Sequence, residues 1–390
     1  MYIKFISFLL LISCCYNNAQ VVSIKVGDNP TIIIPSAALE VASATKGFLP
    51  PRMTKSQMNA IVNPVEGLIV YCTDCNPKCM YLYNGTNWDY LNATTPALLA
   101  SLNCSSAISS GTLLQGITAS GVSSNISYTG GNGGIYTAQS ISSTGVMGLT
   151  ATLTAGTLAN GAGSLTYTIS GTPASAGTAS FAISIGGQSC MLNLQVGIPD
   201  KAYGLTINGF NNHNFIYYPV TGADGKTWLN NNLGAHYANK DHANFSPTQQ
   251  ATSATDHLAY GSLFQWGRAA DGHELINWTN STSGNPVNST TSTLSTNDTA
   301  ANALFIISTL SPYDWRNTQN NNLWQGVNGV NNPCPIGFRL PTNTEFATLV
   351  TASSITNSST AASSTLKFTV PGLRNHTDGS LGNLGSNGYY

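Results

Sequence analysis

The clearest pattern of hydrophobic and polar positions is a strict alternation in the middle of the chain. Apolar residues occupy every second position in three runs there. These residues are Leu165, Tyr167 and Ile169, then Phe181, Ile183 and Ile185, then Cys190, Leu192, Leu194 and Val196. Successive side chains of a β-strand point to opposite faces, so the alternation predicts strands with one buried face. Glycine-rich turns separate such runs, which predicts an immunoglobulin-like β-sandwich over residues 93–198.

The same alternation makes a prediction about two cysteines of this segment. Cys190 shares the core-facing parity of Leu192 and Leu194, and Cys104 has the parity of Leu102 near the other end. A buried bridge between the first and last strands would then join Cys104 to Cys190. In the chain-entropy model a loop of this length stabilises the fold by about 4–5 kcal/mol.

The segment before the sandwich predicts a small mixed module. The sequence TKSQ from Thr54 has capping-box form and predicts a short helix through residues 58–61. Residues 67–71 are apolar and β-branched, as in a buried strand. The dipeptide Asn84-Gly85 lies between two apolar runs, which predicts a hairpin with a two-residue type I′ turn.

Three cysteines, Cys72, Cys75 and Cys79, lie close together between the predicted strands of this module. Zinc would need four thiolate or imidazole ligands, and the nearest histidine in the sequence is His213. In an oxidising compartment a tight disulfide between two of the three is favoured over a zinc site. The sequence does not decide which two cysteines pair.

The N-terminus has the order of a secretory signal. Lys4 precedes a short apolar run at 5–12, which predicts a signal peptide over residues 1–20. Cleavage near Ala19 would release the chain, whereas the sequence LISC resembles a lipobox that would leave Cys14 lipidated. Both outcomes place the protein outside the cell or on the outer-membrane surface. No other segment is apolar over the ~18 residues that a transmembrane helix needs.

Charge is scarce and unevenly distributed. Charged residues make up 7% of the chain and the net charge is −1, which argues against a basic surface that binds nucleic acid. Residues 90–199 contain no Asp, Glu, Lys, Arg or His. The predicted sandwich therefore lacks ordinary acid, base and metal-binding groups, and we interpret it as a spacer.

Two modules of the first half resemble segments of Bacteroidetes surface proteins. The residues 21–92 resemble a fibre-like head module, which implies an exported piece that forms homo-oligomers. The carrying motifs are SAALEV (36–41), KGFLPPRMT (46–54), GLIVY (67–71) and YNGTNW (83–88). The sandwich resembles a repeated surface module, through YTGGNGG (128–134), GSLTYT (163–168), GTPASAGTA (171–179) and GGQSC (186–190).

Residues 199–390 resemble the Fibrobacter succinogenes major paralogous domain family. The carrying motifs are DGKTWLNNNLG (224–234), YGSLFQWGRAADGHE (260–274), NPCPIGFRLPTNTEF (332–346), PGLRN (371–375) and DGSL (378–381). The resemblance implies an exported, non-enzymatic surface module with an α+β, C-type-lectin-like fold. Members of the family continue beyond the Gly-Tyr-Tyr with which this chain ends. The resemblance thus implies that the last strands are missing, together with the partner of Cys334, which is expected to be unpaired.

The remaining residues that could carry chemistry do not have the spacing of a catalytic or metal-binding motif. The adjacent pair His273 and Glu274 would point to opposite faces of a strand, so one site there would need a turn. His236, His242 and His257 match no usual zinc geometry, and we interpret them as solvated loop residues. No nucleophile motif accompanies Cys334. The sequence therefore predicts no catalytic residue, no metal and no cofactor.

Tryptophan is the last candidate for binding. Aromatic faces stack on sugar rings, and five of the six tryptophans lie beyond residue 200. Trp228 and Trp266 lie in family motifs and are predicted to be core residues, whereas Trp315 and Trp324 are flanked by Asn and Gln and are predicted to be exposed binders. The predicted function is a non-catalytic surface protein that contacts a polysaccharide or cell-surface glycan in adhesion. The alternatives are a glycan-acting hydrolase and a purely structural fibre component.

Overall fold

The computed structural model describes residues 24–27, 34–91, 95–206 and 213–390. Contacts divide the chain into two compact units, Met1–Thr94 and Thr95–Tyr390. Strands far outnumber helices, so the protein is multidomain and mainly β, as the sequence predicted. The predicted signal peptide and the predicted lipidation at Cys14 lie outside the described residues. Within those residues, no helix has the length and apolar character needed to cross a membrane.

The N-terminal unit contains two small sheets. In the first, two short strands pair in parallel, namely β1 (Ile24–Gly27) and β2 (Leu39–Ala42). The second sheet has the strand order β3 (Arg52–Met53), β4 (Ile69–Cys72), β5 (Met80–Tyr83) and β6 (Trp88–Tyr90). The helix α1 (Lys55–Asn59) follows β3 along the chain. Their shared core consists of Met58, Val70, Cys72, Cys75 and Tyr81.

The predicted capping box forms, but it shifts the helix along the chain. Thr54 Oγ1 accepts the Gln57 backbone N–H at 3.3 Å, and Gln57 Oε1 accepts the Thr54 backbone N–H at 2.9 Å. Because Thr54 is the N-cap, α1 begins at Lys55 and ends at Asn59 instead of covering residues 58–61.

The predicted hairpin between β5 and β6 is present, but the predicted two-residue turn is wrong. Residues 84–87 form a longer loop between the strands. A type I′ turn needs positive φ at both central residues, and of the dipeptide only Gly85 has it, at 91°. Asn84 Oδ1 instead accepts the backbone N–H groups of Thr86 and Asn87 and closes the wider loop.

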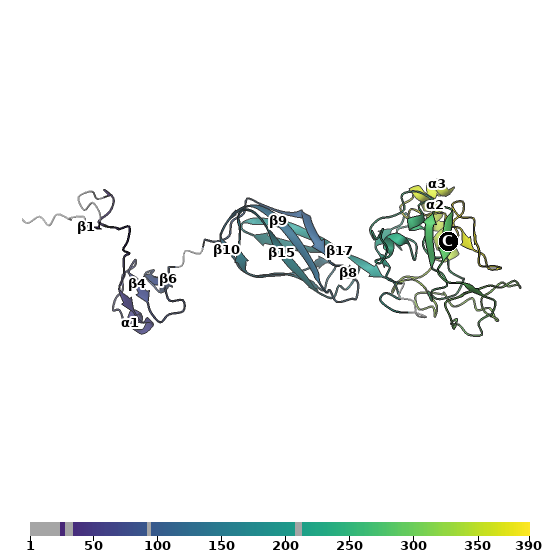
Figure 1. Ribbon diagram of the computed structural model, residues 1–390, viewed down its shortest axis with the longest axis horizontal. Coiled ribbons are helices and arrows are strands. Elements are labelled where there is room, and N and C mark those ends of the chain that lie inside the picture. The colour runs from purple at the N-terminus through teal and green to yellow at the C-terminus, as the bar shows by residue number, and fades with distance from the viewer. Residues whose placement is uncertain (1–23, 28–33, 92–94, 207–212) are drawn as a thin grey trace, which may run out of the picture. The chain divides into compact units, whose positions relative to one another are not determined.

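The sandwich consists of two sheets that share one core. The first has the order β11-β13-β15-β9-β7, and the second has the order β12-β16-β17-β18 with β8 beside β17. Figure 1 shows β9 and β15 side by side in the first sheet. The strands are β7 (Ser101–Ser110), β8 (Leu113–Leu114), β9 (Val122–Asn132), β11 (Gln139–Ser142), β12 (Thr144–Gly145), β13 (Leu149–Leu153), β15 (Asn160–Gly171), β16 (Gly177–Ile185), β17 (Gln188–Pro199) and β18 (Ile216–Tyr217). A short extra pair joins β10 (Ile135–Tyr136) to β14 (Gly156–Thr157).

The core of the sandwich confirms the alternation read from the sequence. Tyr167 and Ile169 of β15 and Phe181 and Ile183 of β16 are each at most 2% exposed and belong to one cluster. Cys104 of β7 and Cys190 of β17 form a disulfide, the pair expected from their parity. Since β7 and β17 belong to different sheets, the bond ties the two sheets together.

The last strand of the sandwich continues into the C-terminal part of the chain. Ile198 and Pro199 at the end of β17 pair with Tyr217 and Ile216 of β18. Ile198 and Tyr217 also share a buried cluster with Phe215. The sandwich and the C-terminal part are therefore joined by a common strand and a common patch of core.

The C-terminal part is built from short strand pairs, two helices and long loops. The strand pairs are β19 (Pro219–Thr221) with β20 (Thr227–Leu229), β21 (Ile276–Asn280) with β22 (Ser283–Pro286), β23 (Thr290–Thr291) with β24 (Phe305–Ile306), and β25 (Leu373–Arg374) with β26 (Leu381–Gly382). The helices are α2 (Asn343–Ala352) and α3 (Ser358–Ser363), with two 3₁₀ turns, η1 (His236–Ala238) and η2 (His257–Ala259). A relation to C-type-lectin-like domains stays a prediction.

Candidate functional site

The β1–β2 pair has one apolar face that the described residues leave uncovered. Ile24 and Val26 lie opposite Leu39 and Val41, and these four side chains are 44–58% exposed. The alternate positions carry the ion pair between Lys25 and Glu40, at 2.9 Å. An isolated two-stranded pair is marginal in water, and parallel strands are normally covered on both faces. The apolar face of β1–β2 therefore has the features of a surface that another polypeptide covers.

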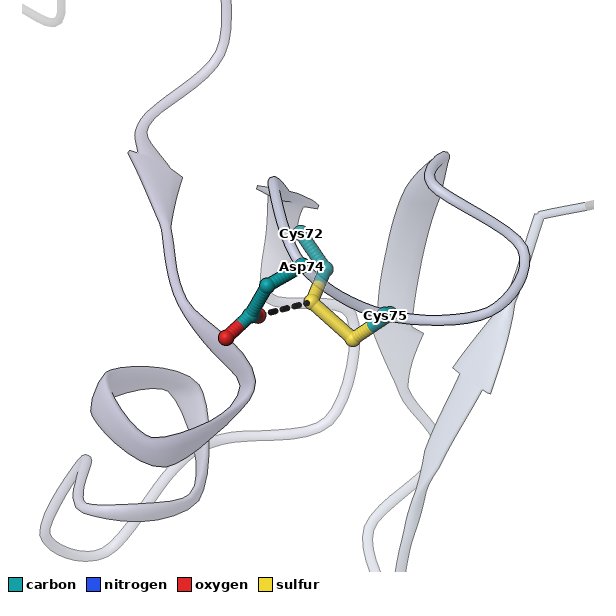
Figure 2. Close-up of side chains that lie close together, drawn as sticks. All are labelled: Cys72, Asp74 and Cys75. Carbon is teal, nitrogen blue, oxygen red and sulfur yellow. Dashed lines mark hydrogen bonds between the residues drawn. A yellow bond between two sulfur atoms is a disulfide. The ribbon is translucent and has the colours of Figure 1, made fainter.

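The cysteine loop after β4 contains a tight disulfide. Cys72 and Cys75 are bonded, and the Asp74 carboxylate lies beside them with Oδ1 3.5 Å from Cys72 Sγ (Figure 2). The same oxygen accepts the Lys55 backbone N–H at the start of α1. The disulfide favoured from the sequence is thus present. Although Cys72, Asp74 and Cys75 lie close enough to hold a metal ion, the bonded sulfurs are not thiolate ligands.

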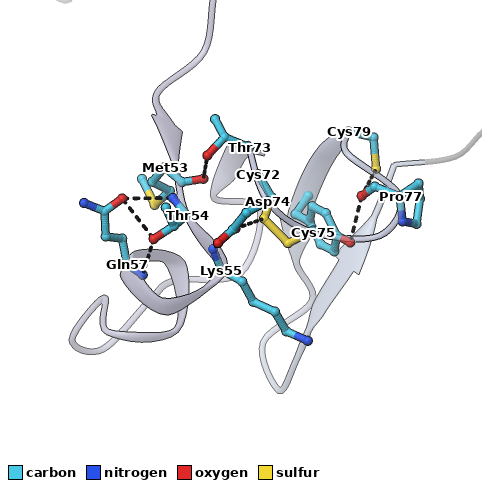
Figure 3. Close-up of a disulfide and its surroundings, with 11 residues drawn as sticks. Met53, Thr54, Lys55, Gln57, Cys72, Thr73, Asp74, Cys75, Pro77 and Cys79 are labelled. Carbon is cyan, nitrogen blue, oxygen red and sulfur yellow. Dashed lines mark hydrogen bonds between the residues drawn. A yellow bond between two sulfur atoms is a disulfide. The ribbon is translucent and has the colours of Figure 1, made fainter.

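The third cysteine of this loop keeps a free thiol. Cys79 is half-buried, and its Sγ lies 3.7 Å from the backbone oxygen of Pro77 (Figure 3). The side chain packs against the core of the N-terminal unit. Its backbone oxygen accepts the Cys72 N–H at 3.0 Å, which closes the loop at its base. Cys79 therefore helps to hold the loop without joining the disulfide.

A large groove lies in the C-terminal part of the chain. It has a volume of ≈ 1020 Å³ and is lined by β20, residues 260–266, the loop 333–341, the start of α2, residues 366–374 and the last three residues. We call it the aromatic groove, because Trp228, Trp266, Trp324, Phe346, Phe368 and Tyr390 contribute to its wall. Its size matches the upper end of ordinary ligand sites.

Packing fixes the aromatic rings of this groove in place. The ring of Trp266 packs against that of Trp324, with ring centroids 5.0 Å apart. Tyr390 packs edge-on against Phe368 at 4.9 Å and is stacked against Phe346 at 6.2 Å. Such offset and edge-to-face contacts are the favourable arrangements for aromatic pairs. The rings therefore form a preorganised surface.

One ion-pair network borders the aromatic groove. Arg339 Nη1 and Nη2 donate to the two carboxylate oxygens of Glu345, at 2.8 and 2.7 Å, and Lys226 Nζ lies 3.7 Å from the same carboxylate. These bonds with Arg339, together with the Thr342 backbone N–H, hold the pKa of Glu345 well below its usual range. Glu345 is thus ionised at any moderate pH, and it is the single carboxylate among the described residues that line the groove.

The predicted exposure of the tryptophans is wrong at three positions. Trp315 is 2% exposed and Trp324 is 9% exposed, whereas Trp266, predicted to be core, is 63% exposed. The indole N–H of Trp315 donates to the Trp266 carbonyl, and that of Trp324 donates to the Arg268 carbonyl. These bonds turn both rings inward despite their polar neighbours in the sequence. Of the two predicted binders, Trp324 reaches the aromatic groove, and there it supports Trp266.

The segment that follows Trp266 contains a buried cluster of charged residues. Asp271, His273 and Glu274 lie close enough to hold a metal ion, because a turn at Gly272, with φ 104°, brings them to one side. The turn that a single site at His273 and Glu274 would need is therefore present. Arg268 Nε donates to Asp271 Oδ2 at 2.7 Å. Burial acts to raise the pKa of Asp271, but His273 and Arg268 outweigh it and the pKa is lowered.

The surroundings of this cluster favour a structural role. Arg374 donates to the backbone oxygens of Gly379, His273 and Asn288, and its guanidinium lies 4.3 Å from the Phe305 ring centroid. Two guanidinium groups thus flank the cluster, and their charge opposes the binding of a metal cation. The bonds of Arg268 and Arg374 tie this cluster to the surrounding loops.

The histidine of η1 differs from its predicted exposure. His236 is buried and stacks on His242 with ring centroids 4.1 Å apart. Burial, and then the neighbouring His242, lower the pKa of His236 to about 4. Solvation is therefore the wrong interpretation for His236, which is neutral at pH 7.

Cys334 belongs to the wall of the aromatic groove. It is buried, and its thiol is free. Burial raises the pKa of the Cys334 thiol to about 12. A thiol that stays protonated is a poor nucleophile, so the structure offers no activation of Cys334.

Comparison with known proteins gives one match. Residues 27–126 match a family described as Phage tail like trimerisation region. The matched range contains β2 to β8 and the start of β9. The comparison with curated proteins and the comparison with solved structures each gave no match.

Proposed function

We propose that the chain is a fibre-like structural component that forms a homotrimer through its N-terminal region. The observation that carries the proposal is the match of residues 27–126 to a trimerisation region. The uncovered apolar face of β1–β2 supports it, because a second and third copy supply the missing cover. Covering four half-exposed apolar side chains contributes roughly 3–6 kcal/mol per chain.

The oligomeric state tests this proposal directly. Light scattering on the full chain is expected to give three times the chain mass of 40.8 kDa. Val26→Asp combined with Val41→Asp places charges on the apolar face and is expected to give monomers. Val62→Asp, at a position that is 83% exposed, is the matched control and is expected to leave the trimer intact. A monomeric wild type, or a trimer that survives the double substitution, refutes the proposal.

We also propose that this component is exported and sits at the surface of a Bacteroidetes-type bacterium. The scarcity of charge, the two disulfides and the signal-like N-terminus support export. The motifs of residues 199–390 support membership of the Fibrobacter succinogenes major paralogous domain family. Antibody labelling of intact cells tests the location, and labelling that requires cell lysis contradicts it.

In this proposal the C-terminal part is displayed for adhesion or glycan contact and carries out no reaction. A hydrolase acting on glycans needs two carboxylates across a cleft, ~5–10 Å apart. The described lining of the aromatic groove supplies Glu345 alone, and Arg339 holds it in a bidentate pair. Incubation with polysaccharides followed by a reducing-end assay tests this point. Release of new reducing ends by purified protein argues for the hydrolase.

A further inference from the structure

Two aromatic side chains in the aromatic groove remain open to solvent. Trp266 is 63% exposed and Tyr389 is 54% exposed. Trp324 supports Trp266, and Asn383 Nδ2 donates to the Tyr389 hydroxyl at 2.7 Å. Because these rings are already held in place, a ligand that stacks on them loses little entropy in ordering them.

The aromatic groove also contains a polar atom without a partner. Asn231 lines the groove and is 8% exposed, and its Oδ1 has no hydrogen-bond partner among the described residues. Its Nδ2 donates to the Gln249 backbone oxygen at 2.7 Å, which fixes the amide. A buried acceptor left unpaired costs free energy, so the fitting ligand brings a hydrogen-bond donor. An acyl chain has none.

The charged side chains of the groove are already paired. Among the described lining residues these are Lys226, Arg339, Glu345 and Arg374. Lys226 and Arg339 face Glu345, and Arg374 donates to three backbone oxygens. A charged ligand would have to displace one of these partners, which favours an uncharged one.

We infer that the aromatic groove binds a segment of a neutral polysaccharide; this inference rests on the display role proposed above. A pyranose ring has an apolar face, which suits Trp266 and Tyr389, and it has hydroxyl donors, which suit Asn231 Oδ1. The volume of ≈ 1020 Å³ lies at the upper end of ordinary ligand sites, so it has room for more than one sugar ring. Recognition comes from stacking and hydroxyl contacts, without a metal ion.

Calorimetric titration of the full chain with neutral oligosaccharides tests the inference. The probes are soluble β-1,4-glucan, xylan, mannan and chitin oligomers, with oligogalacturonate as the charged comparison and a medium-chain fatty acid as the apolar one. At least one neutral oligomer is expected to bind. Trp266→Ala and Asn231→Ala are each expected to weaken that binding about tenfold or more. Tyr90→Ala, an exposed tyrosine of the N-terminal unit, is the matched control and should change nothing.

The outcomes separate this inference from the proposed trimer. Light scattering on the same samples reports the oligomeric state independently, and Trp266→Ala is expected to leave the mass unchanged. Near-ultraviolet circular dichroism checks that each variant is folded. Absence of binding to every neutral oligomer overturns the inference, as does tighter binding of the fatty acid or the charged oligomer. Neutral binding that both substitutions leave intact overturns the assignment to this groove.

Discussion

Removal of the Cys104–Cys190 disulfide is expected to destabilise the sandwich strongly. The bond closes a separation of 86 residues and joins strands of different sheets. The chain-entropy expression gives about 4.6 kcal/mol for such a loop at 25 °C. The Cys72–Cys75 bond spans a separation of 3 residues, and the same expression gives below about 2 kcal/mol. The two disulfides thus provide a long and a short loop in one chain.

The assay compares the double variants Cys104→Ala/Cys190→Ala and Cys72→Ala/Cys75→Ala. Urea unfolding followed by far-ultraviolet circular dichroism gives the free energy of unfolding of each variant. Light scattering checks that the variants have the same oligomeric state. The long-loop variant is expected to lose at least 2 kcal/mol more than the short-loop variant, by the difference of the two estimates of about 4.6 and 2 kcal/mol. Equal losses, or a larger loss for the short loop, refute the argument that loop length sets the stabilisation.

Further predictions concern the C-terminal part. Arg268→Met removes one buried ion-pair partner of Asp271 and is expected to cost about 3–5 kcal/mol, whereas Arg316→Met removes a more exposed pair and should cost under about 1 kcal/mol, both by urea unfolding. Thr342→Ala removes the capping box of α2 and should cost about 1 kcal/mol. The lowered pKa of His236, to about 4, means that this residue's contribution to stability is lost as the pH falls from 6.5 through 4. Asp200 follows directly after β17, and burial raises the pKa of its carboxyl to about 6. Its protonation as the pH falls below 6 therefore stabilises the fold, which is the opposite effect. On acidification from pH 6.5 to 4, the free energy of unfolding should therefore rise for His236→Asn, which keeps the contribution of Asp200. It should fall for Asp200→Asn, which keeps the contribution of His236. Identical pH profiles of the two variants contradict the assignment.

The sandwich could be predicted from the sequence because burial there follows strand geometry directly. In a strand, every second side chain faces the core, so Tyr167 and Phe181 were placed correctly by position alone. Cys104 and Cys190 followed from the same parity. Local hydrogen bonding was less predictable. Asn84 is a residue type typical of a tight turn, but its side chain accepts hydrogen bonds from two backbone N–H groups. These bonds stabilise a longer loop instead of the two-residue turn.

The aromatic groove could not be predicted in this way. Its wall combines Trp266, Trp324 and Tyr390, which lie far apart in the sequence. No common hydrophobic periodicity connects these residues. Where strands are only two to five residues long, exposure depends on tertiary contacts, and neighbours in the sequence carry little information about it. The motif around Trp266 suggested a core residue, yet the ring lies over the groove. The unpaired Oδ1 of Asn231 has no signature in the sequence at all.

The distribution of charge along the chain separates pH-sensitive from pH-insensitive structure. Residues 90–199 contain no acidic, basic or histidine side chain, and burial raises the pKa of Tyr167 in that core to about 12. The titration of side chains therefore contributes almost nothing to the stability of the sandwich between pH 4 and 9. All six histidines lie beyond residue 200, and His236 and Asp200 titrate with opposite effects on stability. Because β17 joins both parts, acid-induced loosening should begin in the C-terminal part while the uncharged sandwich stays folded. In the proposed surface role, the sandwich would persist as a spacer while the C-terminal part responds to the surroundings.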